Sequence, residues 1–105
     1  MNNKVYVILK RSYEFDDFDY GDYCPCFLSL NKDKVIDKFN DIIKEETDHF
    51  NEDMKIDYVK RILTKYPERA EDFQIVRDSE DRFEIYFDNW CYDWKLGEYE
   101  LDTIL

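Results

Sequence analysis

The first thirty residues contain two short apolar runs of the length and composition of β-strands. The segment from Lys4 to Arg11 is rich in β-branched residues and predicts a first strand. The segment from Phe27 to Leu30 predicts a second strand after an acidic connection. Together these segments predict a β-hairpin with a long loop.

The middle of the chain changes to helical spacing. Apolar residues recur three and four positions apart, first at Val35, Ile36, Phe39, Ile42, Ile43 and Phe50, and then at Met54, Tyr58, Val59, Ile62, Leu63 and Tyr66. Asn31 or Asp33 can cap the first helix, and Asn51 is expected to mark the break between the two. Pro67 should end the second helix because proline cannot continue its hydrogen-bond ladder.

In the last third of the chain, apolar and polar residues alternate with the two-residue period of β-strands. Further strands are predicted around Phe73 and Ile75, across Phe83, Ile85 and Phe87, and from Glu98 to Asp102. The element order β-β-α-α-β-β-β predicts an α+β fold, with a mostly antiparallel sheet of about five strands and two helices on one face. Residues 1–105 are expected to form a single domain.

Composition excludes disorder and several function classes. Hydrophobic residues make up 44% and aromatic residues 18%, which is too apolar for a disordered chain. The net charge of −11 argues against direct binding to nucleic acid. With only two glycines, Gly21 and Gly97, the chain cannot contain a Walker loop or a dinucleotide-binding fingerprint.

The acidity is concentrated in residues 70–105, where eleven acidic residues face three basic ones. Glu98, Glu100 and Asp102 alternate with apolar residues, so their carboxylates should share one strand face. Pairing with the strand that carries Glu84 and Asp88 would gather up to five carboxylates on the outer face of the sheet. We interpret this face as a surface for a basic partner; the alternative is a solvated sheet face.

The segment 13–23 is a second candidate contact surface. It combines five aromatic residues with five acids and no base; the acids are Glu14, Asp16, Asp17, Asp19 and Asp22. Such a mixture suits an interface loop that selects a basic protein, although its aromatic residues could instead fold back on the sheet. The glycine and glutamate positions of an EF-hand are not met, which leaves weak cation binding as a minor alternative.

Two further acidic or aromatic features are more ambiguous. The segment 89–94 contains two tryptophans, and we expect one of Trp90 and Trp94 to be core and the other to be a partner contact. In the first helix, acids recur at four-residue spacing from Asp33 to Glu45, which we interpret mainly as a solvated face. Glu46 stands out because it projects toward the apolar positions of that helix.

Catalytic and metal-binding patterns are weak. The chain has three cysteines, Cys24, Cys26 and Cys91, and this odd number suggests reduced thiols. A minor alternative is a Cys3His zinc site with His49 as the fourth ligand. His49 near a helix C-terminus needs no more than a structural role. No nucleophile-elbow motif is present, so we expect no enzyme, no catalytic residues and no cofactor.

These features favour a non-enzymatic inhibitor that occupies a basic, nucleic-acid-binding surface of a partner protein and imitates nucleic-acid charge. The partner is expected to be a nucleic-acid-handling enzyme or effector, and the net charge argues against direct contact with nucleic acid. No signal-peptide core or membrane span is evident, so we expect the protein in the bacterial or infected-host cytosol, without membrane contact. In size, acidity and lack of catalytic motifs, the chain resembles inhibitors made by phages and mobile elements, such as anti-CRISPR proteins, and also immunity proteins; this likeness covers no motif. The alternative is a small cytosolic regulatory domain, homodimeric through an exposed strand edge, whose acidity serves solubility.

Overall fold

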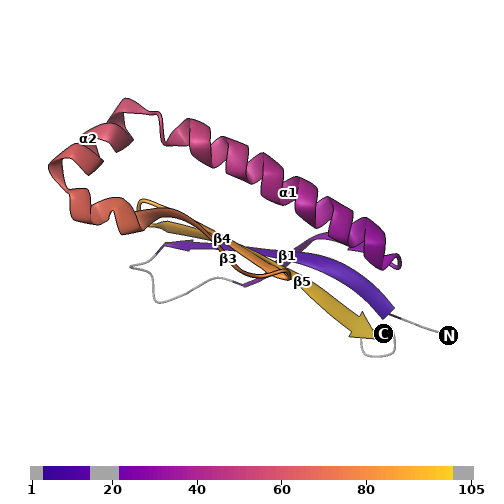
Figure 1. The fold of residues 1–105 in the computed structure, drawn as a ribbon. Helices are drawn as coiled ribbons and strands as arrows, with labels where there is room; N and C mark the ends of the chain where they lie inside the picture. Colours follow the sequence, from indigo (N-terminus) through magenta and orange to yellow (C-terminus); the bar gives the residue numbers. More distant parts are fainter. Residues whose placement is uncertain (1–3, 15–21, 101–105) are drawn as a thin grey trace.

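A computed structural model describes residues 4–14 and 22–100. The elements follow the order β1 (Lys4–Glu14), β2 (Cys24–Ser29), α1 (Lys32–Asp53), α2 (Asp57–Lys65), the 3-10 helix η1 (Pro67–Asp72), β3 (Phe73–Ser79), β4 (Arg82–Phe87) and β5 (Trp90–Glu100). Figure 1 shows the helices on the same side of the sheet. The predicted α+β class and element order are confirmed.

The five strands form one antiparallel sheet in the order β2-β1-β5-β4-β3. The first and last strands of the chain are neighbours in its centre, paired from Lys4 opposite Glu100 to Glu14 opposite Trp90. β1 also pairs with β2, which confirms the predicted hairpin. The loop between these two strands, residues 15–21, lies outside the described residues.

The apolar core lies between α1 and the sheet. Strand alternation places Ile8, Phe83 and Trp94 on the helix-covered face, where they pack against Val35 and Phe39 of α1. All five side chains are at most 3% exposed. Burial of such side chains stabilises the fold by about 1.5–3 kcal/mol each, and this is what fixes α1 on the sheet.

Helix α1 begins where the sequence predicts but extends further. Its N-cap is Asn31, whose Oδ1 accepts hydrogen bonds from the backbone N–H groups of Asp33 and Lys34 at 3.0 and 3.3 Å. The predicted break at Asn51 is wrong, because the helix continues to Asp53. Asparagine lowers helix propensity only modestly, and Phe50 still packs against the core beside it.

The second helical segment begins at Asp57, three residues after the start of its apolar pattern at Met54. Helix α2 stops at Lys65, and Pro67 then begins the 3-10 helix η1 at a position where its missing N–H is tolerated. Val59 is the buried residue of α2, at 1% exposure. Thus Pro67 ends the α-helix, as predicted, and also starts the next element.

Strand β5 is longer than predicted and has different neighbours. It begins at Trp90, so the segment 89–94 is mostly strand and not a connection. β4 pairs with residues 90–95 of β5, whereas Glu98 and Glu100 lie beyond β4 and face Tyr6 and Lys4 of β1. The predicted pairing of the acidic end of the last strand with β4 is therefore wrong.

Within the described residues, neither helix is long and apolar enough to cross a membrane.

Candidate functional site

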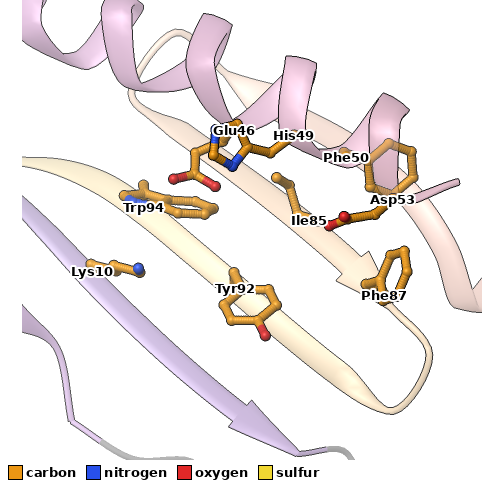
Figure 2. A pocket seen from close by; sticks show the side chains of 9 residues that line it. All are labelled: Lys10, Glu46, His49, Phe50, Asp53, Ile85, Phe87, Tyr92 and Trp94. Carbon is orange, nitrogen blue, oxygen red and sulfur yellow. The ribbon is translucent and has the colours of Figure 1, made fainter. Parts of the chain in front are cut away.

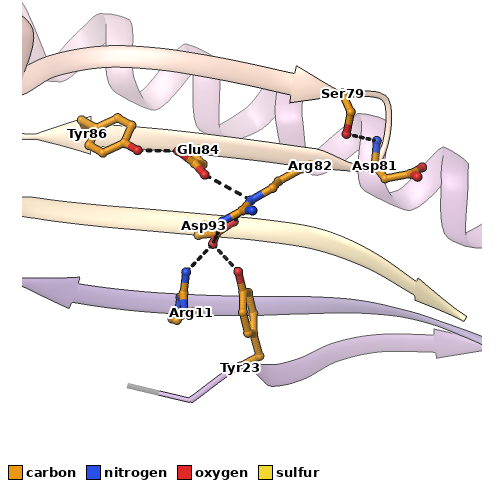
Figure 3. Close-up of polar contacts among 8 residues, drawn as sticks. All are labelled: Arg11, Tyr23, Ser79, Asp81, Arg82, Glu84, Tyr86 and Asp93. Atoms are coloured by element: carbon orange, nitrogen blue, oxygen red, sulfur yellow. Dashed lines mark hydrogen bonds and ion pairs between the residues drawn. The ribbon is translucent and has the colours of Figure 1, made fainter. Parts of the chain in front are cut away.

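The sheet face opposite the helices carries a network of charges around Asp93. This carboxylate is 1% exposed and accepts hydrogen bonds from Arg11 Nη2 at 2.9 Å and Arg82 Nη2 at 3.0 Å. The hydroxyl of Tyr23 donates a third hydrogen bond (Figure 3). Because a buried carboxylate is costly without partners, these three donors explain why Asp93 is tolerated there.

Glu84 extends the network on β4. Its carboxylate is 8% exposed, lies 3.1 Å from Arg82 Nε and accepts a hydrogen bond from the Tyr86 hydroxyl. Burial, and then the bond to Glu84, raise the pKa of Tyr86. The hydrogen bond to Asp93 raises the pKa of Arg82. Arg82 contacts both carboxylates and Arg11 bonds to Asp93 through Nη2, so the network has the character of a structural element.

A pocket of about 220 Å³ lies on the opposite face, between the second half of α1 and the sheet. Its floor is formed by β4 and β5; the floor residues are Ile85, Phe87, Tyr92 and Trp94 (Figure 2). Tyr92 and Trp94 lie two residues apart on β5, and their ring centroids are 6.4 Å apart. Phe50 meets Phe87 edge to face at 6.2 Å, so aromatic rings cover much of the pocket surface.

Polar groups stand at the mouth of this pocket. Glu46, His49 and Asp53 reach it from α1, and Lys10 reaches it from β1. Glu46 is half-buried, yet neither Glu46 nor Asp53 has an ion pair or side-chain hydrogen bond to another described residue. The Lys10 ammonium lies 5.2 Å from the centre of the Trp94 ring. The pocket thus joins aromatic surface to two carboxylates, the half-buried Glu46 and the exposed Asp53, that have no partner among the described residues.

A row of carboxylates also follows the solvent side of α1. Asp33, Asp37, Asp41 and Glu45 are all exposed and stand four residues apart, about 6 Å per step along the helix axis. None of them forms an ion pair with another residue in the part of the chain that the structure describes. We call these four residues the α1 acidic row.

The structure disperses the acids predicted on β4 and β5. Glu84 lies in the network on the open sheet face, whereas Glu98 lies on the helix-covered side and pairs with Lys4 at 3.4 Å. Asp88 stands in the turn after β4 with φ 58° and accepts a hydrogen bond from Arg69. The predicted five-carboxylate face is wrong: β5 turns Glu98 and Glu100 to the face opposite Glu84, and Asp102 lies outside the described residues.

Other predicted contact residues have mixed placements. Glu14, Asp22 and Glu100 are exposed, while Asp16, Asp17 and Asp19 lie outside the described residues. Trp94 is 3% exposed, as expected for a core residue, and Trp90 is 44% exposed and stacked beside Tyr92. The prediction of one buried and one accessible tryptophan is confirmed in its geometry.

The cysteines are free, as predicted. Cys24 and Cys26 are exposed on β2, and Cys91 is buried on the open sheet face. His49 lies across the sheet from Cys91, so the Cys3His alternative is not assembled. No group of three or more potential ligands among the described residues could hold a metal ion.

Sequence reasoning missed both the pocket and the network. The usable signal for the pocket was Glu46, an acid at a position of α1 that faces the apolar side. For the network no local signal exists, because Arg11 and Asp93 are 82 positions apart.

No protein-family model, curated protein or solved structure matches this chain.

Proposed function

We propose that this chain is a non-enzymatic binding protein that occupies a basic, nucleic-acid-binding surface of a partner protein and so blocks it. The α1 acidic row carries this proposal. It displays regularly spaced, unpaired carboxylates on a 22-residue helix that is fixed to the sheet by its apolar face. A row of negative charge on a helix that is already formed can imitate a nucleic-acid backbone at a low ordering cost for the main chain.

The distribution of positive charge supports this reading. Arg11, Arg69 and Arg82 are held in ion pairs with acids of the sheet and of the turn after β4. Helix α1 itself carries eight acids against four lysines and has no basic residue in its last turn. The helix therefore presents a net negative surface, and binding through it should weaken as salt screens the charges.

The experiment is affinity capture from a nuclease-treated bacterial lysate with two matched variants as baits. One variant removes charge from the row (Asp37→Asn, Asp41→Asn, Glu45→Gln). The control removes the same charge from exposed acids elsewhere (Glu68→Gln, Glu71→Gln, Glu80→Gln). Proteins eluted by 0.5 M NaCl are identified and then tested for nucleic-acid binding in the presence of each variant.

Under the proposal, wild type and control capture the same nucleic-acid-binding protein and displace its nucleic acid, and the row variant does neither. Equal capture by the row variant and the control would overturn the role of α1. Recovery of no protein, or of a partner that keeps its nucleic acid when this chain binds, would overturn the proposed function itself.

A second candidate function is a homodimeric interaction domain, and one observation favours it. The edge strand β2 and the residue after it expose Leu28 and Leu30 at 60% and 69%. Pro25 in the same strand opposes edge pairing, because proline lacks a donor. Light scattering separates the candidates: a dimer that persists in 0.5 M NaCl and is lost in Leu28→Lys would favour this second function.

A further inference from the structure

The pocket under α1 has the composition of a site for an organic cation. Its floor is lined by the rings of Tyr92 and Trp94, of which Tyr92 is the more accessible, and its mouth offers the carboxylates of Glu46 and Asp53. Cations are attracted to the faces of aromatic rings and to carboxylates, and both effects strengthen where water is partly excluded. Glu46 is already half-buried without a partner among the described residues, so it gains most from an incoming cation.

The size of the pocket limits what can enter. About 220 Å³ is below the range of about 300–1,000 Å³ that is typical of small-molecule sites. It is enough for one long side chain. The openness of the site between α1 and the sheet suits a side chain that is presented from outside on another protein.

We infer that this pocket receives an arginine side chain of the basic partner, an inference that rests on the proposed function. A guanidinium is planar, so it can stack on Tyr92 while its N–H groups bond to Glu46 and Asp53. A lysine ammonium lacks that plane and fork. Because the pocket opens along the same helix that carries the α1 acidic row, one bound protein could contact both.

Lys10 gives the inference a sharp internal test. Its ammonium lies over Trp94 at the β1 side of the pocket, where it repels a second cation and would attract an anion. Removing this charge should therefore strengthen arginine binding. If the natural occupant were an anion or the carboxylate end of a small zwitterion, the same change should weaken binding.

The experiment is an NMR titration with N-acetyl-arginine amide at pH 8, with the uncharged isostere N-acetyl-citrulline amide as the matched probe. The Trp94 indole N–H reports on the pocket floor, and Trp90→Phe removes the only other indole signal. The variants are Glu46→Gln with Asp53→Asn, Lys10→Met, and a control, Glu68→Gln with Glu71→Gln, which removes equal charge from exposed acids outside the pocket and the α1 acidic row.

We expect shifts at Trp94 with arginine, about tenfold weaker binding of citrulline, and a similar loss in the Glu46 and Asp53 double variant, because both changes remove the charge that strengthens the hydrogen bonds between the guanidinium and the carboxylates. The control should bind arginine within about twofold of wild type, and Lys10→Met should bind it more tightly. Equal binding of both probes, shifts confined to residues outside the pocket, or weaker binding by Lys10→Met would overturn the inference. Unchanged amide spectra away from the pocket verify that each variant is folded.

This test needs no partner protein, so its failure is distinct from failure of the proposed function. If the pocket ignores arginine while the row variant loses its partner, only the inference fails. If the pocket binds arginine while capture finds no nucleic-acid-binding partner, only the proposed function fails.

Discussion

Asp93 and Trp94 are consecutive residues of β5 and are almost equally buried, at 1% and 3% exposure, on opposite faces of the sheet. Trp94 is buried under α1 against apolar neighbours. Asp93 has no helix over it and is enclosed by the side chains that bond to it, from Arg11, Arg82 and Tyr23.

The comparison shows that one sheet can be closed in two physical ways. The helix-covered face excludes water with apolar side chains, and the resulting stabilisation of the fold scales with the apolar area that is buried. On the open face, the long side chains of Arg11, Arg82 and Tyr23 cover Asp93, and their polar ends bond to its carboxylate. The first arrangement tolerates salt and pH; the second depends on the protonation of its members.

The largest effect should come from breaking the helix-covered face. Phe39→Ala removes a side chain that is 1% exposed at the centre of the core and should lower the free energy of unfolding by about 4 kcal/mol, from lost burial and the cavity left behind. Urea unfolding measures this. Leu30→Ala, at a residue 69% exposed, is the control and should change stability by no more than about 0.5 kcal/mol. Similar losses in both variants would mean that α1 does not close the core.

A smaller but still large effect should follow from Asp93→Asn on the open face. The amide has the size of the carboxylate but leaves Arg11 and Arg82 directed at a neutral group. We expect the free energy of unfolding to fall by about 3 kcal/mol. This is the lower end for a broken buried ion pair, because the Arg82 side chain is 41% exposed. Asp72→Asn breaks a more accessible pair, in which the side chains of Arg69 and Asp72 are 29% and 39% exposed, and should cost less than about 1 kcal/mol. Equal urea midpoints for the two variants would contradict the burial contrast.

The smallest effect concerns Tyr23 and depends on pH. Burial raises its pKa to about 12, so the folded protein keeps the phenol protonated at pH values where the unfolded chain ionises. The raised pKa of Tyr23 therefore adds to the free energy of unfolding in full below pH 10, and this stabilisation is lost as the pH rises through about 12. Tyr23→Phe should therefore cost about 1 kcal/mol at pH 8, from the lost hydrogen bond, and should lose less stability than wild type between pH 10 and 12. Parallel declines of the two urea midpoints would contradict this assignment.

The sequence was sufficient for elements whose apolar residues follow one period. The α1 pattern from Val35 to Phe50 and the alternation of Phe83, Ile85 and Phe87 predict the correct element types and buried faces. Their partners are apolar in any arrangement, so the prediction does not need to know which residues they meet.

The rest depended on pairing between distant segments. Trp90, Tyr92 and Trp94 do alternate, but the density of aromatic residues suggested a connection, and only pairing with β1 and β4 makes a strand of it. The burial of Asp93 could not be predicted from neighbouring residues either. Its donors are Arg11 of β1, Arg82 of β4 and Tyr23, the residue before β2. For the candidate site, the aromatic floor and Glu46 were visible separately, whereas their meeting required the fold.

The central pairing of β1 with β5 has a consequence for synthesis. Arg11 and Asp93 are separated by 82 positions, so at about 5–20 residues per second the ribosome makes the partner of β1 about 4–16 s after β1 itself. Through that interval the nascent chain can form the β1–β2 hairpin and α1, but the other edge of β1 has no strand to pair with. The sheet can be completed only when β5 has left the ribosome, so until then β1 is the strand that a chaperone would have to shield.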